Sequence, residues 1–337
     1  MKKALVFFVL SAFVVASVFS LGTTEENADT EPRELIVYTY DSFCGDWGPG
    51  FGIAKAFEEK TGIKIRYVEL DSAVDVYSKI VFEGDSCPAD IAIGMPDTMV
   101  IDPSYFAAWT PECDPDLIYY ERDSHLVPFD YGIFSFIIDT QSNGAPVPTC
   151  FEDLTKDIYR NKIILVDPRT SGVGLGLLNW TVKAMGIDGA FSWWSRIRDN
   201  VLTVGSSWSS AYGLFTEHEA PLVISYTTSP VYHYMYEDTD RYRAVEFKEG
   251  HLLTIEYMGI LEKSSKKEEA QAFCNFVLTE GQSDIAVANT MFPANTKTAL
   301  PEAFERVALM PARILMPSES ESQQILIDRW VNVMAGK

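Results

Sequence analysis

The feature that most constrains the fold is an alternation of short apolar strands and amphipathic helices that begins near residue 34. The first strand, Glu34–Tyr40 (ELIVYTY), is rich in β-branched and aromatic residues, which is typical of strands. The pattern then predicts a helix over Ile53–Lys60, a strand over Ile63–Leu70, a helix over Val74–Glu83 and a strand over Ala89–Gly94. Strands that alternate with helices in this way predict a parallel sheet of the α/β class.

The alternation continues through the rest of the chain. Further strands are predicted near Gly132–Ile138, Lys162–Val166 and Leu222–Tyr226, and further helices near Gly174–Met185, Ala190–Asp199, Lys266–Thr279 and Ser322–Met334. A chain of 337 residues exceeds the size at which one hydrophobic core usually stops growing, so two lobes are expected. No obvious linker separates them, which suits a chain that crosses between the lobes more than once.

The N-terminus has the layout of a secretory signal peptide. Two lysines precede an apolar run, Ala4–Phe19, and cleavage is expected after Ser20 or Gly22. We therefore assign residues 1–22 to a signal peptide and 23–32 to a flexible tether, and we predict that the mature protein lies in the periplasm. A membrane anchor is the alternative, although the apolar run is short for a span.

The chain is strongly acidic, with 27 basic and 48 acidic residues and a net charge of −21. A field of this sign makes nucleic acids and anionic membrane surfaces poor partners, whereas it attracts small cations. We therefore expect no nucleic-acid partner.

The motifs of common catalytic and metal sites are missing from the sequence. It contains no GxSxG, HExxH, GxxxxGK[ST] or GxGxxG motif. Neither its histidines nor its cysteines stand at metal-ligand spacing. In an exported chain the five cysteines allow one or two disulfides, with at least one thiol left free. The residues concerned are His125, His218, His233 and His251, and Cys44, Cys87, Cys113, Cys150 and Cys274. We expect no catalytic residue, no metal ion and no cofactor.

Aromatic, hydroxyl and acidic residues are concentrated in loops that would follow strands, where open α/β sheets hold their ligands. Each such segment alone is weak evidence, because aromatic residues are usually core and Ser/Thr runs usually form caps or turns. Together they predict a ligand site. The segments are Thr39–Trp47 (TYDSFCGDW), Pro128–Gly132 (PFDYG), Asp167–Leu178 (DPRTSGVGLGLL), Ser207–Leu214 (SWSSAYGL) and Ser225–Tyr234 (SYTTSPVYHY).

In this order, the segments resemble the bacterial thiamine-binding periplasmic proteins that serve ABC importers. The likeness runs from about Leu35 to about Ala294 and rests on YTYDSF followed by DWGPG, VPFDYG, DPRTS followed by GLGLL, WSSAYGLF, and SYTTSP followed by YH. It implies a two-lobed periplasmic binding protein fold of class II, similar to ferric-ion-binding proteins and thiaminase I, with a ligand cleft between the lobes. Lobe one would comprise residues 33–127 and 253–312, lobe two residues 128–252, and a C-terminal helical segment residues 313–337.

The resemblance also implies a function. The protein would be no enzyme; it would bind thiamine, or its mono- or diphosphate, as a monomer and deliver it to the membrane permease of an ABC importer. The family has a ligand-stacking Trp where this chain has Thr290, so one aromatic wall is expected to be missing. The family's ligand contacts fall here on Tyr40, Trp47, Asp71, Ser72, Ala73, Ser171, Gly172, Trp208, Tyr226, Thr227, Thr228, Ser229 and Tyr232.

The residue types at these positions suit the chemistry of thiamine, which has two flat rings, one of them a permanently cationic thiazolium. Each favourable aromatic face adds a cation–π attraction of roughly 0.5 to 2 kcal/mol. A carboxylate, from Asp41 or Asp46, is a candidate to balance the charge or to accept a hydrogen bond from the aminopyrimidine, and either residue could equally serve a turn. Hydroxyl groups and the backbone N–H groups at Gly172, before a predicted helix, suit the tail or its phosphate.

Two alternatives keep the same fold. Ferric-binding relatives coordinate iron through neighbouring tyrosines, and Tyr232–Tyr236 contains three. A thiaminase-like enzyme would use Cys44 as its nucleophile, which requires a lowered thiol pKa and a nearby base. The binding protein is the interpretation that we carry forward.

Overall fold

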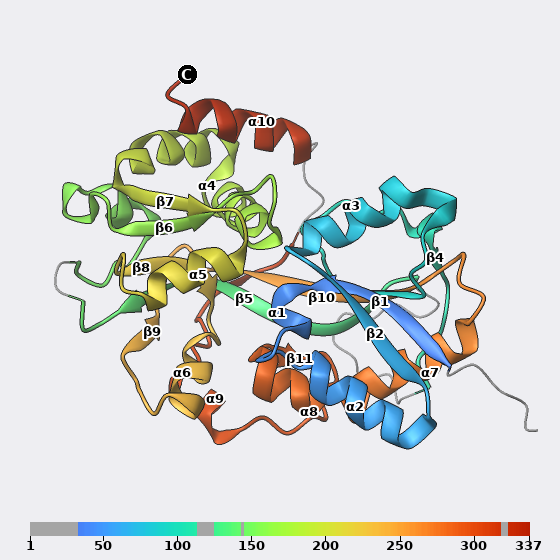
Figure 1. Ribbon diagram of the computed structural model, residues 1–337. Helices are drawn as coiled ribbons and strands as arrows, with labels where there is room; N and C mark the ends of the chain where they lie inside the picture. Colours follow the sequence, from blue (N-terminus) through green and yellow to red (C-terminus); the bar gives the residue numbers. More distant parts are fainter. Residues whose placement is uncertain (1–32, 113–124, 143–144, 318–322) are drawn as a thin grey trace, which may run out of the picture. The chain divides into compact units, whose positions relative to one another are not determined.

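The predicted strand–helix alternation forms one end of a mixed β-sheet (Figure 1). The computed structural model describes residues 33–112, 125–142, 145–317 and 323–337. Strand β1 (Glu34–Tyr40) pairs in parallel with β2 (Lys64–Leu70) and β3 (Ile91–Pro96), and the connecting helices are α2 (Gly50–Thr61) and α3 (Ala73–Glu83). The strands and helices predicted for this region are therefore confirmed, with ends that differ by a few residues.

Two long antiparallel strands, β5 (Val127–Asp139) and β10 (His251–Leu261), occupy the middle of the sheet (Figure 1). The sheet order across the described strands is β2-β1-β3-β10-β5-β8-β6-β7. Each of the two strands contributes to two apolar cores: Met258 packs in the first core, with β1 and β3, and Leu252 in the second. The same two strands therefore run from one core to the other. The lobe boundaries given above stay a prediction.

The second core is built on β6 (Ile163–Val166), which pairs in parallel with β7 (Val201–Gly205) and β8 (Leu222–Tyr226). Helix α4 (Gly172–Ile197) packs on these strands. Its backbone is not helical at Gly186, at φ 72° and ψ 165°, so two helical segments meet there in a kink, as the two helices predicted for this region require. A positive φ of this size favours glycine, which has no Cβ.

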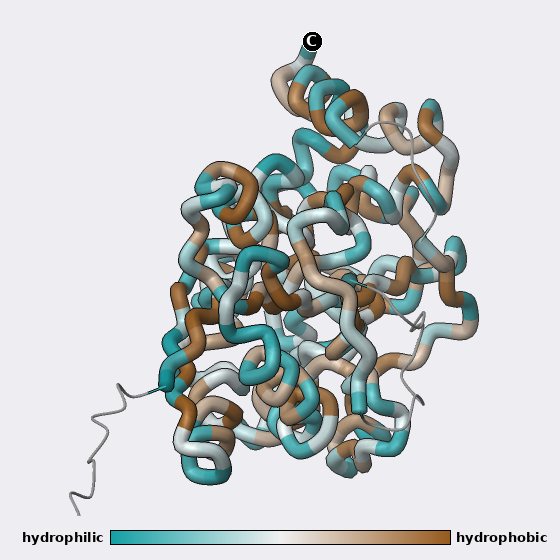
Figure 2. Tube along the Cα trace, turned by 90° about the vertical axis from the view of Figure 1, so that its right-hand side faces the viewer, coloured by the Kyte–Doolittle hydropathy of each residue, from teal (hydrophilic) through white to brown (hydrophobic). Residues whose placement is uncertain are grey.

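The C-terminal helix α10 (Gln323–Met334) covers α4. Trp330 meets Trp194 edge-on, with ring centroids 6.0 Å apart. Figure 2 shows that α10, next to the labelled C-terminus, alternates hydrophobic and hydrophilic residues, as an amphipathic helix does. The predicted C-terminal helix thus completes the second core.

Shorter elements connect these parts. The remaining helices are α1 (Asp41–Cys44), α5 (Trp208–Thr216), α6 (Pro230–Tyr236), α7 (Lys267–Leu278), α8 (Gln282–Asp284) and α9 (Glu302–Val307). The remaining strands are β4 (Phe106–Ala107), β9 (Tyr242–Ala244), β11 (Phe292–Pro293) and β12 (Ile314–Leu315). The 3₁₀ turns are Gly84–Ser86, Pro103–Tyr105, Phe151–Thr155, Asp157–Tyr159 and Arg198–Asn200, and Ile285–Asn289 forms a π-turn.

The predicted signal peptide and tether lie outside the described residues. Within the described part of the chain, no helix has the length and hydrophobicity needed to cross a bilayer. Cys44, Cys87, Cys150 and Cys274 have free thiols, so they form no disulfide with one another, and Cys113 lies outside the described residues.

A buried histidine, His251, ties β10 to its surroundings in the second core. Its Nδ1 lies 2.7 Å from the carbonyl oxygen of Phe134, and its Nε2 accepts the backbone N–H of Phe247 at 2.8 Å. Because a carbonyl can only accept, the proton lies on Nδ1, and the neutral ring satisfies both partners. Burial lowers the pKa of His251, against a smaller opposing effect of the Phe134 carbonyl.

We expect His251 to make the free energy of unfolding depend on pH. Because the pKa of His251 is lower in the folded protein, the ring is protonated in the unfolded chain at a higher pH than in the folded one. The neutral ring therefore contributes its full stabilisation above the unfolded pKa of about 6.5, and this stabilisation is lost as the pH falls below that value. Denaturant titrations at about pH 7.5 and about pH 5 should show a larger loss of stability for the wild type than for His251→Gln. Equal losses in the two proteins would mean that folding does not lower the pKa of His251.

Candidate functional site

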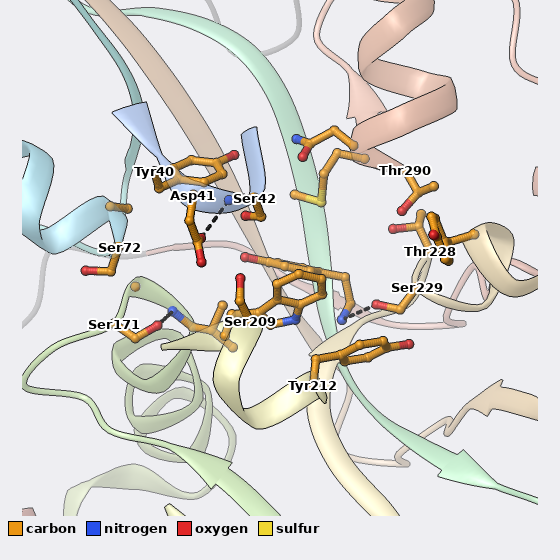
Figure 3. Close-up of a pocket in the computed structure, with 18 of the residues that line it drawn as sticks. Tyr40, Asp41, Ser42, Ser72, Ser171, Ser209, Tyr212, Thr228, Ser229 and Thr290 are labelled. Atoms are coloured by element: carbon orange, nitrogen blue, oxygen red, sulfur yellow. Dashed lines mark hydrogen bonds between the residues drawn. The ribbon is translucent and has the colours of Figure 1, made fainter. Parts of the chain in front are cut away.

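A cavity of about 450 Å³ lies where the ends of several strands and helices of both cores meet (Figure 3). This is a usual volume for a small-molecule site. Figure 3 shows Tyr40, at the end of β1, and Asp41, just after it, on one side of this space, and Thr228 and Ser229, which follow β8, on another. The central strand β10 adds Glu256 to the lining. We call this cavity the pocket.

All the ligand residues predicted from the sequence line the pocket, except Asp46 and Thr227. The residues brought together are Tyr40, Asp41, Trp47, Asp71, Ser72, Ala73, Ser171, Gly172, Trp208, Tyr226, Thr228, Ser229 and Tyr232. The structure places Asp46 on the surface, whereas Thr227 is buried behind the pocket and its N–H donates to the Ile133 carbonyl.

Three helices begin at or beside the pocket, and each is capped by a serine. Ser72 accepts the N–H of Asp75 at the start of α3, Ser171 that of Val173 at the start of α4, and Ser207 caps α5. The remaining first-turn N–H groups of a helix carry a partial positive charge. The starts of α3 and α4 therefore give the pocket wall groups that can receive an anionic or hydroxyl substituent.

A stack of rings forms one wall. Trp208 packs on Tyr212 with centroids 4.9 Å apart and an interplanar angle of 21°, and its Nε1–H donates to Ser225 Oγ at 2.8 Å. Ser225 Oγ in turn lies 2.7 Å from Ser229 Oγ. The Trp47 ring lies next to that of Trp208, with a centroid distance of 6.1 Å and a tilt of 46°, and Trp47 is 45% exposed. Trp208 is thus held from behind, whereas Trp47 has room to move.

A hydrogen-bonded relay supports this wall. The His233 Nδ1 lies 2.7 Å from Glu237 Oε2, and its Nε2 lies 3.0 Å from the Tyr212 hydroxyl. Because a carboxylate accepts, Nδ1 carries the proton, and Nε2 accepts from Tyr212. Burial lowers the pKa of His233, and Glu237 opposes this shift. The relay fixes the ring on which Trp208 packs.

Carboxyl groups lie at the floor of the pocket and beneath it: Glu256 lines the pocket, whereas Asp130 is buried and does not. The Tyr40 hydroxyl donates to Glu256 Oε2 at 2.6 Å, and Asn289 Nδ2 donates to Asp130 Oδ2 at 2.8 Å. Burial raises the pKa of both Glu256 and Asp130. Nearer the mouth, burial also raises the pKa of Asp41, against the opposing hydrogen bonds of Ser209 and Ser42.

Sequence reasoning missed several residues of the lining, among them Glu256, Asn289, Tyr212 and His233. Tyr212 and His233 lie within Ser207–Leu214 and Ser225–Tyr234, two of the segments that predict the site, although neither residue was singled out. Glu256 carried a different signal, because it interrupts the apolar run HLLTIEYMGIL and an acidic residue inside a buried strand is unusual. Asn289 carried no signal, because it comes from a π-turn whose position near the pocket depends on long-range packing.

The residues behind the two alternative functions are poorly placed for them. Cys44 does not line the pocket; its thiol lies 3.5 Å from the Tyr40 carbonyl oxygen, and burial, with the charge of Glu69, raises its pKa to about 11. A nucleophile needs a lowered pKa instead.

The iron-binding alternative lacks its ligands. Among the three tyrosines of residues 232–236, only Tyr232 lines the pocket, and the described residues hold no cluster of three or more His, Cys, Asp or Glu suited to a metal ion.

Comparison with known proteins agrees with the fold and with the sequence segments. The profile of a family described as "Bacterial extracellular solute-binding protein" matches residues 98–312. The thiamine-binding periplasmic protein of Brucella suis is 33% identical over 330 residues, covering 96% of this chain and 97% of the relative. That of Escherichia coli K12 is 37% identical over 305 residues, covering 88% and 92%.

Solved structures give the same result. A structure titled "Periplasmic thiamin binding protein" superposes with a TM-score of 0.79 at 35% identity and covers 89% of this chain and 96% of its own. Iron-bound HitA from Pseudomonas aeruginosa, at 18% identity and a TM-score of 0.69, covers 90% and 99% and shares the fold alone. The predicted fold class, a periplasmic binding protein fold similar to the ferric-binding proteins, is therefore confirmed. The chain belongs to the family of bacterial periplasmic thiamine-binding proteins.

Proposed function

We propose that this protein captures thiamine or a thiamine phosphate in the pocket, outside the cytoplasmic membrane, and delivers it to the permease of an ABC importer. The observation that carries the proposal is the lining itself. It combines stacked aromatic faces with the carboxyl groups of Asp41, Asp71, Glu237 and Glu256, and no Lys or Arg is among the described residues that line it. A flat organic cation is the ligand that such a pocket favours.

The rings of the ligand would lie against Trp208 and its neighbours. A ring inserted between two aromatic faces needs about 7 Å, twice a contact distance of about 3.5 Å, which exceeds the 6.1 Å between Trp47 and Trp208. Trp47 therefore moves outward when a ring enters between them. The buried hydroxyl of Thr228, which has no partner among the described residues, is free to bond a ring nitrogen or the amino group.

The hydroxyethyl tail, or its phosphate, would lie toward Ser171 and Gly172. Because no Lys or Arg is among the described residues of the lining, backbone N–H groups at the start of α4 would hold a phosphate, as helix N-termini commonly do. We propose binding without turnover and one ligand per monomer.

The direct test is titration of the purified exported protein with thiamine and its two phosphates by calorimetry, with native mass spectrometry of the mixture. We expect a one-to-one complex with a monomer and an unchanged ligand mass. Failure of all three forms to bind would overturn the proposed function, and cleavage of thiamine in the presence of an amine would favour the thiaminase-like alternative.

The first binding prediction concerns Trp208. Trp208→Ala removes the principal aromatic face, so the Kd for thiamine should rise about tenfold or more, equivalent to about 1.4 kcal/mol. Phe82→Ala, on an exposed ring of α3 outside the pocket lining, is the matched control and should bind as the wild type does. A loss of about 3 to 5 kcal/mol in stability would instead mark Trp208 as a core residue.

The second prediction concerns Thr290, which lines the pocket and which the resemblance matches to a ligand-stacking Trp of the family. Its backbone is left-handed, at φ 49°, which is unfavourable for a β-branched residue. Thr290→Trp adds an aromatic wall and removes the branch, so it should tighten thiamine binding about two- to twelvefold, equivalent to about 0.5 to 1.5 kcal/mol. Thr290→Leu, which adds bulk without a π face, should gain less. Weaker binding by Thr290→Trp would mean that another side chain already fills this position.

A further inference from the structure

We propose that Glu256 is the counter-ion for the cationic ring of the ligand, and that binding of the cation releases a proton from the buried carboxyl groups beneath the pocket. This inference rests on the proposed function and assigns a residue outside the contacts that the family resemblance implies.

Glu256 is positioned to face a ligand and is held there. It lies in the central strand β10, lines the pocket and is only 6% exposed. The Tyr40 hydroxyl donates to its Oε2 at 2.6 Å, and Tyr40 itself comes from β1, two strands away in the sheet. Among the described residues no other hydrogen bond to Glu256 is formed by a side chain, so the carboxyl group keeps acceptor capacity for a ligand.

A second acid lies beside it. Asp130 of β5 is the cross-strand partner of Glu256, and the side chains of such partners lie on the same face of the sheet, close together. Asp130 is fully buried; its Oδ2 accepts from Asn289, whereas its Oδ1 has no hydrogen-bond partner in the described part of the chain. Two carboxyl groups are thus buried as neighbours.

The groups around Glu256 supply no positive charge. Those that face it are the Tyr40 and Tyr226 hydroxyls, Asp130, and Asp97, which accepts from Thr254 at 2.8 Å. Two buried carboxylates without a cation repel each other and lose their hydration, so the pair retains a proton in the empty pocket. Burial raises the pKa of Asp97 to about 7 as well.

A cation in the pocket changes this balance. A positive ring near Glu256 stabilises the ionised carboxylate and lowers its pKa, so a proton leaves as the ligand enters. Proton release makes the affinity for the cation depend on pH. The affinity rises with pH from the lowered pKa of the complex to the raised pKa of the ligand-free protein, and above the higher pKa it stays constant. The sequence offered Asp41 or Asp46 for this role. Asp46 does not line the pocket, and Asp41 is less buried than Glu256, so solvent screens its charge more strongly.

The experiment compares thiamine with an analogue whose thiazolium is replaced by an uncharged ring of the same shape. Calorimetry of the full exported protein near neutral pH, in two buffers with different heats of ionisation, measures the protons released. We expect release with thiamine and none with the neutral analogue. Wild-type affinity for thiamine should rise from about pH 5.5 to about pH 8, whereas affinity for the analogue should stay level.

Glu256→Gln tests the residue, because Gln keeps the shape and an acceptor for Tyr40. The variant should bind thiamine about tenfold or more weakly, release fewer protons, and bind the neutral analogue as the wild type does. Glu262→Gln, at an exposed position just after β10, is the control and should behave as the wild type.

The outcomes separate the two proposals. If the wild type binds thiamine without proton release and with no preference over the neutral analogue, the counter-ion assignment is wrong and the proposed function stands. These wild-type measurements decide the matter even where Glu256→Gln does not fold. If the wild type binds neither thiamine nor its phosphates, the proposed function fails and this inference fails with it.

Discussion

The antiparallel pairing of β5 with β10 is the constraint on which the rest of the structure depends. Through it the chain passes between its two cores, so the strand ends on either side converge on the pocket. The same register sets Asp130 opposite Glu256. A shift by one residue would turn one of these carboxyl groups to the other face and remove the acid pair, because side chains alternate along a strand.

Buried acids at this position cost stability, and the surrounding contacts offset only part of that cost. Tyr40, Asn289 and Thr254 each donate one hydrogen bond to the group, while one oxygen each of Asp97 and Asp130 has no partner in the described chain. An apolar strand pair would fold more favourably. A bound cation would offset the cost of burying these acids, because it would pair with the charge that the core leaves uncompensated.

Sequence patterns predicted local structure well and long-range placement poorly. The parallel strands β1 to β3 follow from β-branched runs, and the loops after strands supplied most of the lining. Strand β10 was not predicted, although it is the centre of the sheet, and therefore Glu256 was missed. The π-turn that brings Asn289 and Thr290 to the pocket has no sequence signature, because π-turns are rare and depend on tertiary packing. The site residues taken from the resemblance await binding measurements.

The two tryptophans of the aromatic wall differ in how firmly they are held. Trp208 is fixed through Ser225 and through Tyr212, whose hydroxyl bonds His233, so three elements determine its orientation. Trp47, on the facing side, is nearly half exposed and lies in a Gly-rich segment. A rigid face opposite a movable one allows a ring to enter and then be covered, and the entropic cost of ordering falls mainly on Trp47. Because the proposed release to an importer would require the reverse step, the movable face is the part of the pocket that can change without disturbing either core.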